Sequence, residues 1–188
     1  MADTLEEELL QAVKFSRSKE VRELLAANKY ISKCAALRKA VENGNQEIAV
    51  ILIIAGANPA GPVFHSLAEM GWTDAVRASF DNISDMHFHT NYALLYAATN
   101  GHAEIVEMLL TAGANVREYH NNTLRGAVKN NHLKVVELLT SYYTTKELEE
   151  IRSELQSPLL ADVIARHMPR GSRTKAALRD PRPVESDI

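Results

Sequence analysis

The sequence has one cysteine, few aromatics and no long apolar run, and each shortage excludes a class of protein. Cys34 alone cannot form an internal disulfide, so nothing ties the fold to an oxidising compartment. The longest apolar stretch, residues 48–57, is about half of the roughly 20 residues that cross a bilayer. The first residues also lack the basic start of a secretory signal. We therefore expect a cytoplasmic protein that begins at its own Met1 and does not contact a membrane.

Glycine and proline are also scarce, with eight and six residues, and aromatics make up 6% of the chain. Helices tolerate little of the first two, and strands are enriched in aromatics, so this composition favours an all-α fold. The formal net charge is −3, which gives no overall attraction for nucleic acid. The sequence thus predicts a helical protein with no nucleic-acid partner.

A pattern of small and apolar residues recurs five times along the chain. Its clearest copy, AATNGHAEIVEMLLTAGAN at residues 97–115, is matched by residues 36–58 and 123–139, and by weaker copies at residues 9–25 and 64–76. One position, just after the first apolar run, fixes the register with successive spacings of 28, 27, 30 and 30 residues. The residues at this register position are Ser16, Gly44, Gly71, Gly101 and Asn131.

Each copy has the hydrophobic spacing of a short helix, a turn and a second helix. Alanine stands at one position of the first helix in four copies, where its small size allows neighbouring helix pairs to approach closely; these residues are Ala12, Ala40, Ala97 and Ala127. No single pair can bury its apolar face alone. The repeat therefore predicts a solenoid, in which stacked pairs share one continuous core.

These units resemble the ankyrin-repeat family, most closely at residues 97–115. His65 stands where that family has its T-P-L-H-x-A histidine, a place held in other units by Arg38, Leu95 and Arg125. The units are shorter than the family's 33 residues and are similar to the divergent repeats of giant viruses, amoebae and intracellular bacteria. The resemblance implies an ankyrin-like helical solenoid of about five short repeats, near residues 5–30, 34–59, 62–82, 91–116 and 121–143.

The chain after residue 143 does not repeat the motif. Residues 144–168 have a threonine followed by early acids, then a second start at Ser157-Pro158, which predicts a capping helix pair at the end of the solenoid. From residue 169 there are three prolines, no aromatics and five basic residues against three acidic ones. We expect one repeat domain at residues 1–168 and a disordered basic tail at residues 169–188.

Candidate chemistry is sparse. His87 and His89, with His65 or His120, would be the ligands of a metal site, but cysteine or carboxylate partners at ligand spacing are missing. Cys34 lies just before a repeat helix and fits a partly buried small residue better than a nucleophile. No P-loop, G-x-S-x-G or H-E-x-x-H motif is present. We expect no catalytic residues, no metal and no cofactor.

The function implied by the resemblance is protein binding by a non-catalytic adaptor or scaffold, through the concave groove and loops of the solenoid. Met70, Phe88 and Tyr119 are the preferred anchors, because exposed apolar and aromatic side chains are enriched in interface cores. We expect Phe88 and His89 to lie on a loop. The predicted partner-binding residues are Met70, Phe88, His89, Asn100, Arg117, Tyr119, His120 and Lys129.

A second hypothesis is a secreted bacterial or viral effector that acts in the host cytosol and modulates a host protein or enzyme. In either case the partner is another protein of unknown identity. The chain on its own is expected to be monomeric.

Overall fold

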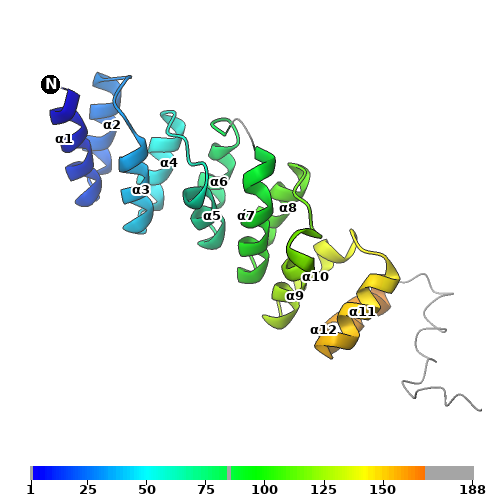
Figure 1. Cartoon of the computed structure of the whole chain (residues 1–188). Helices are drawn as coiled ribbons and strands as arrows, with labels where there is room; N and C mark the ends of the chain where they lie inside the picture. The colour runs from blue at the N-terminus through cyan, green and yellow to red at the C-terminus, as the bar shows by residue number, and fades with distance from the viewer. Residues whose placement is uncertain (1, 84–85, 168–188) are drawn as a thin grey trace, which may run out of the picture.

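The computed structural model describes residues 2–83 and 86–167, and these residues form helices stacked in pairs along one direction (Figure 1). The predicted all-α solenoid is confirmed, since no strand is present in the described ranges. In Figure 1 the first helix of each pair lies toward the viewer and the second lies behind it.

The helices are numbered in chain order. The bounds are α1 Ala2–Lys14, α2 Ser18–Ala27, α3 Cys34–Glu42, α4 Gln46–Ile54, α5 Pro62–Glu69, α6 Thr73–Ser79, α7 Met86–Asn100, α8 Ala103–Thr111, η1 Glu118–Asn121, α9 Asn122–Lys129, α10 Leu133–Thr140, α11 Thr145–Leu155 and α12 Pro158–His167. We call the helix pairs α1/α2, α3/α4, α5/α6, α7/α8 and α9/α10 units 1 to 5. The solvent-exposed side of α1, α3, α5, α7 and α9 is the first-helix face, and that of α2, α4, α6, α8 and α10 is the second-helix face.

The core runs through the whole stack, as the repeat predicts. Each first helix contacts the first helices of the neighbouring units, with the most extensive contacts between α7 and its neighbours α5 and α9. The repeated alanines are fully buried, and so are the leucines three residues before them: Leu9, Leu37, Leu94 and Leu124. Small residues therefore set a close helix spacing while the leucines fill the space between units.

Unit 3 departs most from the repeat, but its two helices are in place. Ser79 is buried where other units have leucine, and its hydroxyl donates to the Ala75 carbonyl at 2.6 Å, so no buried donor is left without a partner. Phe80 then packs edge-on against Phe64, with ring centroids 6.4 Å apart. An aromatic contact thus replaces part of the missing aliphatic packing.

The structure has two helices where the sequence predicts a capping pair. Thr144 accepts a hydrogen bond from the Glu147 backbone, and the Glu147 carboxylate accepts one from the Thr144 backbone, which is the reciprocal capping box that starts α11. Leu148 and Ile151 of α11 are buried, and α12 packs against α10. The predicted tail at residues 169–188 lies outside the described residues, and the boundary between domain and tail stays a prediction.

No helix in the described part of the chain is long and apolar enough to cross a membrane.

Candidate functional site

Two histidines, His102 and His132, join neighbouring units. The His102 ring nitrogen Nε2 is 2.8 Å from the Glu69 carbonyl, and the His132 Nε2 is 2.9 Å from the Thr99 carbonyl. Each ring occupies the space above a glycine of the preceding unit: a Cβ on Gly71 would lie 2.6 Å from His102, and one on Gly101 would lie 2.5 Å from His132. These two histidines therefore have a structural role, and each needs a glycine beneath it.

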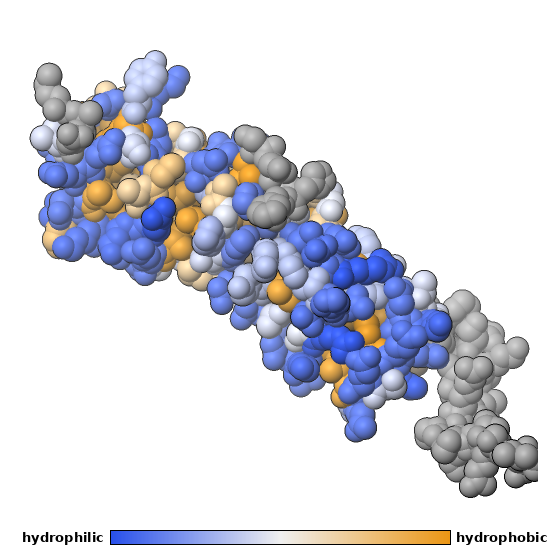
Figure 2. All heavy atoms as spheres, viewed as in Figure 1, coloured by the Kyte–Doolittle hydropathy of each residue, from blue (hydrophilic) through white to orange (hydrophobic). Residues whose placement is uncertain are grey.

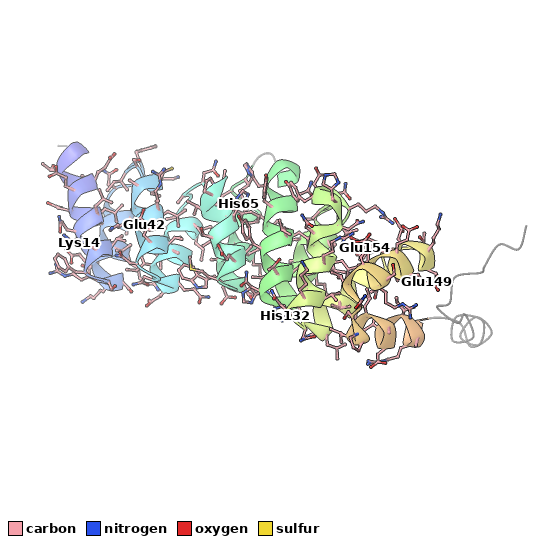
Figure 3. All side chains as sticks on the ribbon, turned by 60° about the horizontal axis from the view of Figure 1, so that its bottom comes forward. Lys14, Glu42, His65, His132, Glu149 and Glu154 are labelled. Carbon is pink, nitrogen blue, oxygen red and sulfur yellow. The ribbon has the colours of Figure 1, made fainter. Side chains whose placement is uncertain are left out.

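Five aromatic and imidazole rings gather on the first-helix face between units 3 and 5. We call this set the ring cluster; its members are His65, His89, Tyr92, Tyr96 and Tyr119. The His65 centroid lies 5.3 Å from Tyr92 and 6.3 Å from Tyr96, and the Tyr92 and Tyr119 rings are 4.4 Å apart. Figure 3 places His65 at the junction of α5 and α7. Rings from three separate elements thus form one platform.

Helix periodicity explains how α7 contributes to the cluster. Tyr92 and Tyr96 are one turn apart and share a face, while Leu94, Ala97 and Ala98 on the opposite face are fully buried. Tyr92 is 42% exposed. Because the buried face fixes the rotation of α7, the two tyrosines must point towards solvent beside His65 on α5.

The Tyr119 ring reaches the cluster through a turn with an unusual backbone conformation. Tyr119, His120 and Asn121 have φ values of 56°, 55° and 61°, all in the left-handed region. For residues other than glycine this conformation costs roughly 1–2 kcal/mol each. The Asn121 side-chain oxygen is also buried without a hydrogen-bond partner. This strained turn carries the Tyr119 ring onto Tyr92.

The surroundings of two rings of the cluster, His65 and Tyr119, favour their neutral forms. Burial lowers the pKa of His65, and the nearby His89 lowers it further, while the Nε2 of His65 is buried without a hydrogen-bond partner. Burial raises the pKa of Tyr119 to about 12, helped by the adjacent Tyr92, which also shares a hydrogen bond with it. Both groups are therefore uncharged near neutral pH.

The structure brings only part of the predicted set together. His89 and Tyr119 belong to the ring cluster. The expectation of a loop at Phe88 and His89 was wrong, because α7 begins at Met86 and no glycine or proline interrupts the sequence before Gly101. The side chain of Phe88 lies outside the described part of the structure.

Three predicted residues form a separate row at the C-terminal ends of the first helices. Met70 directly follows α5 and is 41% exposed, Asn100 ends α7, and Lys129 ends α9. Asn100 donates to the Tyr96 carbonyl at 2.9 Å. Met70 is five residues beyond His65, or about 7.5 Å along the helix axis. This row therefore lies along the same face but apart from the ring cluster.

Arg117 is engaged within the chain. Its guanidinium donates to the Glu147 carboxylate at 3.0 Å and to the Tyr142 carbonyl at 2.7 Å, and it lies over the Tyr143 ring. The Tyr143 hydroxyl in turn donates to the Val116 carbonyl at 2.8 Å. These contacts fasten the start of α11 to the loop after α8. His120, the last of the predicted set, is exposed in the left-handed turn.

The sequence hypothesis missed Tyr92 and Tyr96, although a signal was present. At the same two repeat positions the neighbouring units 3 and 5 have Pro62 and Ser66, and Asn122 and Gly126. Two tyrosines on the solvent-exposed face of one repeat are therefore additions to the repeat pattern. A comparison of units position by position would have found them.

Other reactive groups are less organised. Among the described residues no group of three or more His, Cys, Asp or Glu side chains gathers to hold a metal ion, and the His87 side chain is not part of that description. Cys34 is exposed rather than partly buried as expected, because it is the first residue of α3 and precedes the buried stripe.

The comparison with protein families agrees with this geometry. Residues 64–149 match the model for ankyrin repeats, with three copies, and this range holds units 3 to 5 and the first turn of α11. No curated protein matches the chain. The match identifies residues 64–149 as ankyrin repeats, and the stacked helix pairs and the alanine spacing show an ankyrin-like helical solenoid.

Proposed function

We propose that this chain is a non-catalytic adaptor or scaffold that holds a partner protein on its first-helix face, centred on the ring cluster. Ankyrin repeats are generally protein–protein interaction modules. The observation that supports this site is Tyr92, which leaves 42% of its surface in water while its ring packs between His65 and Tyr119. A supported aromatic with one open face is the usual form of an interface anchor.

The support beneath Tyr92 favours binding energetically. A side chain that is free in solution loses about 0.5–1.5 kcal/mol of conformational entropy when a partner immobilises it. Tyr92 and Tyr119 are already held against each other, with ring centroids 4.4 Å apart, so little of that loss remains. The neutral state of His65 and Tyr119 also avoids the desolvation of a charge on binding.

The surroundings of the cluster suit a polar rim. Glu118 and His120 are exposed beside Tyr119, and Asn100 and Lys129 are exposed at the ends of their helices. Figure 2 shows that hydrophilic residues cover most of the C-terminal half of the visible face, with apolar residues gathered over the N-terminal half. The ring cluster thus presents aromatic rings within a hydrophilic surround, and aromatic residues are enriched in interface cores while the rim is polar. A single free cysteine fits the cytoplasm as its location.

The test begins with the capture of partners by crosslinking and mass spectrometry, and then measures affinity with purified partner. Tyr92→Ala should fold normally and bind at least about thirtyfold more weakly, the loss expected of an anchor worth 2 kcal/mol. Tyr142→Ala is the matched control, because Tyr142 is similarly exposed at 47% but lies after α10. Unchanged affinity in a folded Tyr92→Ala variant would place the interface elsewhere.

The predicted anchors are tested in the same assay. Tyr119→Ala should weaken binding because it removes the ring that supports Tyr92. Met70→Ala and Phe88→Ala then show how far the interface extends beyond the ring cluster along α5 and towards the start of α7.

A further inference from the structure

Helix α4 differs from the second helices of the other units. Counting six residues after the register position gives Val50 in α4, whereas the other four units have a charged residue there: Arg22, Arg77, Glu107 and Glu137. Counting ten residues gives Ile54, against Ala26, Asp81, Thr111 and Ser141. Unit 2 therefore has large apolar side chains at two positions that are polar or small elsewhere in the same chain.

Three of the four charged residues at the first of these positions form an ion pair with a neighbouring helix. Arg22 of α2 pairs with Glu47 of α4 at 3.3 Å, and Arg77 of α6 pairs with Glu104 of α8 at 2.6 Å. Glu137 of α10 pairs with Arg166 of α12 at 2.8 Å. An ion pair thus joins neighbouring units across the second-helix face in two places, and a third joins unit 5 to α12.

The corresponding pair between α4 and α6 is missing. Asp74 occupies in α6 the place that Glu47 and Glu104 hold in their helices, three residues after the register position. An arginine from the preceding unit pairs with each of those glutamates. For Asp74 the preceding unit is unit 2, which has Val50 at the arginine position. In the described part of the structure Asp74 makes no ion pair, and its side chain is exposed.

These residues line an open groove of about 590 Å³ on the second-helix face, which we call the α4 groove. Its apolar part is Leu25, Val50, Ile51, Ile54 and Ala55, and its polar part is Arg22, Gln46, Glu47 and Asp74. Ile54 is 73% exposed, so its side chain contributes little to the core. Because Arg22 and Glu47 neutralise each other, Asp74 leaves the groove with one uncompensated negative charge.

We propose that the α4 groove is a second docking surface, which takes a segment of another protein that has apolar side chains next to a lysine or arginine. The apolar residues would cover Val50 and Ile54, and the basic residue would pair with Asp74. The chain itself shows this chemistry: in units 1 and 3 an arginine meets the equivalent acid. A partner would supply the charge that α4 lacks, and electrostatic complementarity of this kind gives specificity and orientation.

This surface is on the opposite side of the helix pairs from the ring cluster. The second helices that line the α4 groove lie behind the first helices in Figure 1. A chain that binds one protein on each face would join them, which goes beyond the single binding site proposed above. The two surfaces share no residue, so either proposal can fail without the other.

The first test uses a phage-displayed library of random 16-residue peptides on the immobilised full chain. The wild type should enrich peptides with two or more apolar residues beside a lysine or arginine. The double variant Val50→Glu, Ile54→Thr should lose this class and bind its best members at least tenfold more weakly. These replacements are the residues of α8 at the same positions, Glu107 and Thr111, so the helix should tolerate them; circular dichroism checks this.

Tyr92→Ala is the control for the other face, and it should retain the enriched class with unchanged affinity. If the double variant also retains the class, or the wild type enriches none, the proposal is wrong. Loss of the class in Tyr92→Ala instead would assign those peptides to the ring cluster and equally overturn it.

The second test concerns charge. Asp74→Lys should weaken the best peptide at least fivefold by fluorescence polarisation, and replacing the basic residue of that peptide with glutamate should restore affinity to the variant. Equal affinities of the wild type and Asp74→Lys for both the basic peptide and its glutamate version would contradict the role of Asp74. Sedimentation equilibrium tests whether a second copy of the chain fills the groove instead. If the wild type is a dimer and the double variant is a monomer, a second copy fills the groove and the proposal is wrong.

Discussion

Units 1 and 2 differ from units 3 to 5 in how neighbouring units are joined. At the joins from unit 3 to 4 and from unit 4 to 5, a histidine lies over the glycine of the preceding unit and bonds to its first helix, as with Gly71 and His102. At the joins from unit 1 to 2 and from unit 2 to 3, the same two places hold Ser16 with Asn45 and Gly44 with Trp72. A Cβ on Gly44 would meet nothing within 4 Å.

This difference shows that the repeat glycine has two separate uses. At Gly44 only the positive φ of 69° favours glycine, and Ser16 and Asn131 adopt similar angles at the same register position. At Gly71 and Gly101 the next unit's imidazole also needs the space. The family match begins at residue 64, so it covers the units joined by histidines and leaves out those that are not.

The largest expected effect on stability comes from a glycine that lies beneath a histidine. Gly101→Ala should lower the free energy of unfolding by about 3 kcal/mol, from a left-handed alanine and a Cβ 2.5 Å from His132. Gly44→Ala should cost only about 1 kcal/mol, because its Cβ meets open space. Urea unfolding monitored by circular dichroism measures both.

The double variant Gly101→Ala, His132→Ala identifies the cause. If the overlap dominates, the double variant should be more stable than Gly101→Ala, although it has lost the hydrogen bond to Thr99. Equal costs at Gly44 and Gly101 would show that backbone conformation alone selects glycine.

Acid should weaken the C-terminal end before the units that precede it. The Arg117 guanidinium, with the Thr144 hydrogen bonds, lowers the pKa of Glu147 to about 2 from an ordinary 4.5. A lowered carboxyl pKa stabilises the fold above the unfolded value and loses that contribution as the pH falls from about 4.5 towards 2. The protection factors of the α11 amides, which compare observed exchange with the intrinsic rate at the same pH, should therefore fall in this range. Glu147→Gln should remove the pH dependence, and an unchanged profile in that variant would contradict it.

A smaller effect is expected from His65. Its lowered pKa means that the unfolded chain takes up a proton at a higher pH than the folded chain, so stability should fall as the pH drops below about 6.5. The difference in unfolding free energy between pH 7.5 and pH 5.0 should be smaller in His65→Gln than in the wild type. If both proteins show the same difference, His65 does not contribute.

The smallest expected effect makes unit 1 more like the later units. Ser16 has a φ of 56°, so Ser16→Gly should relieve backbone strain. The greater freedom of glycine in the unfolded chain offsets part of that gain. We expect the free energy of unfolding to rise by up to about 1 kcal/mol in urea titrations. A clear loss would mean that the Ser16 side chain stabilises the turn.

The fold could be predicted from the sequence because the repeated residues are those that pack in the core. Alanines and leucines at fixed spacing report the buried face directly, and they identified the first helices, the second helices and the register. The same reasoning could not find the ring cluster. Tyr119 reaches Tyr92 only through three consecutive left-handed residues, and tyrosine has no preference for that conformation.

The start of α7 and the role of Arg117 were missed for related reasons. The repeat length placed Phe88 and His89 before the unit, but the absence of a helix breaker allows α7 to begin at Met86. Arg117 resembled a free loop residue, and its partner Glu147 lies 30 positions later in a helix outside the repeat. Contacts between a repeat and a non-repeating segment have no periodic signal.

The join between Gly101 and His132 also determines which units evolution or a designer could copy. Unit 4 contains both residue types of this join: His102 bonds to the preceding unit, and Gly101 leaves space for the histidine of the next unit. A tandem duplication of unit 4 would therefore form a complete join at each new boundary. A duplicated unit 2 would place Asn45 above Gly44, with no imidazole to fill the space. Growth of this solenoid by whole units is thus most compatible with its C-terminal half.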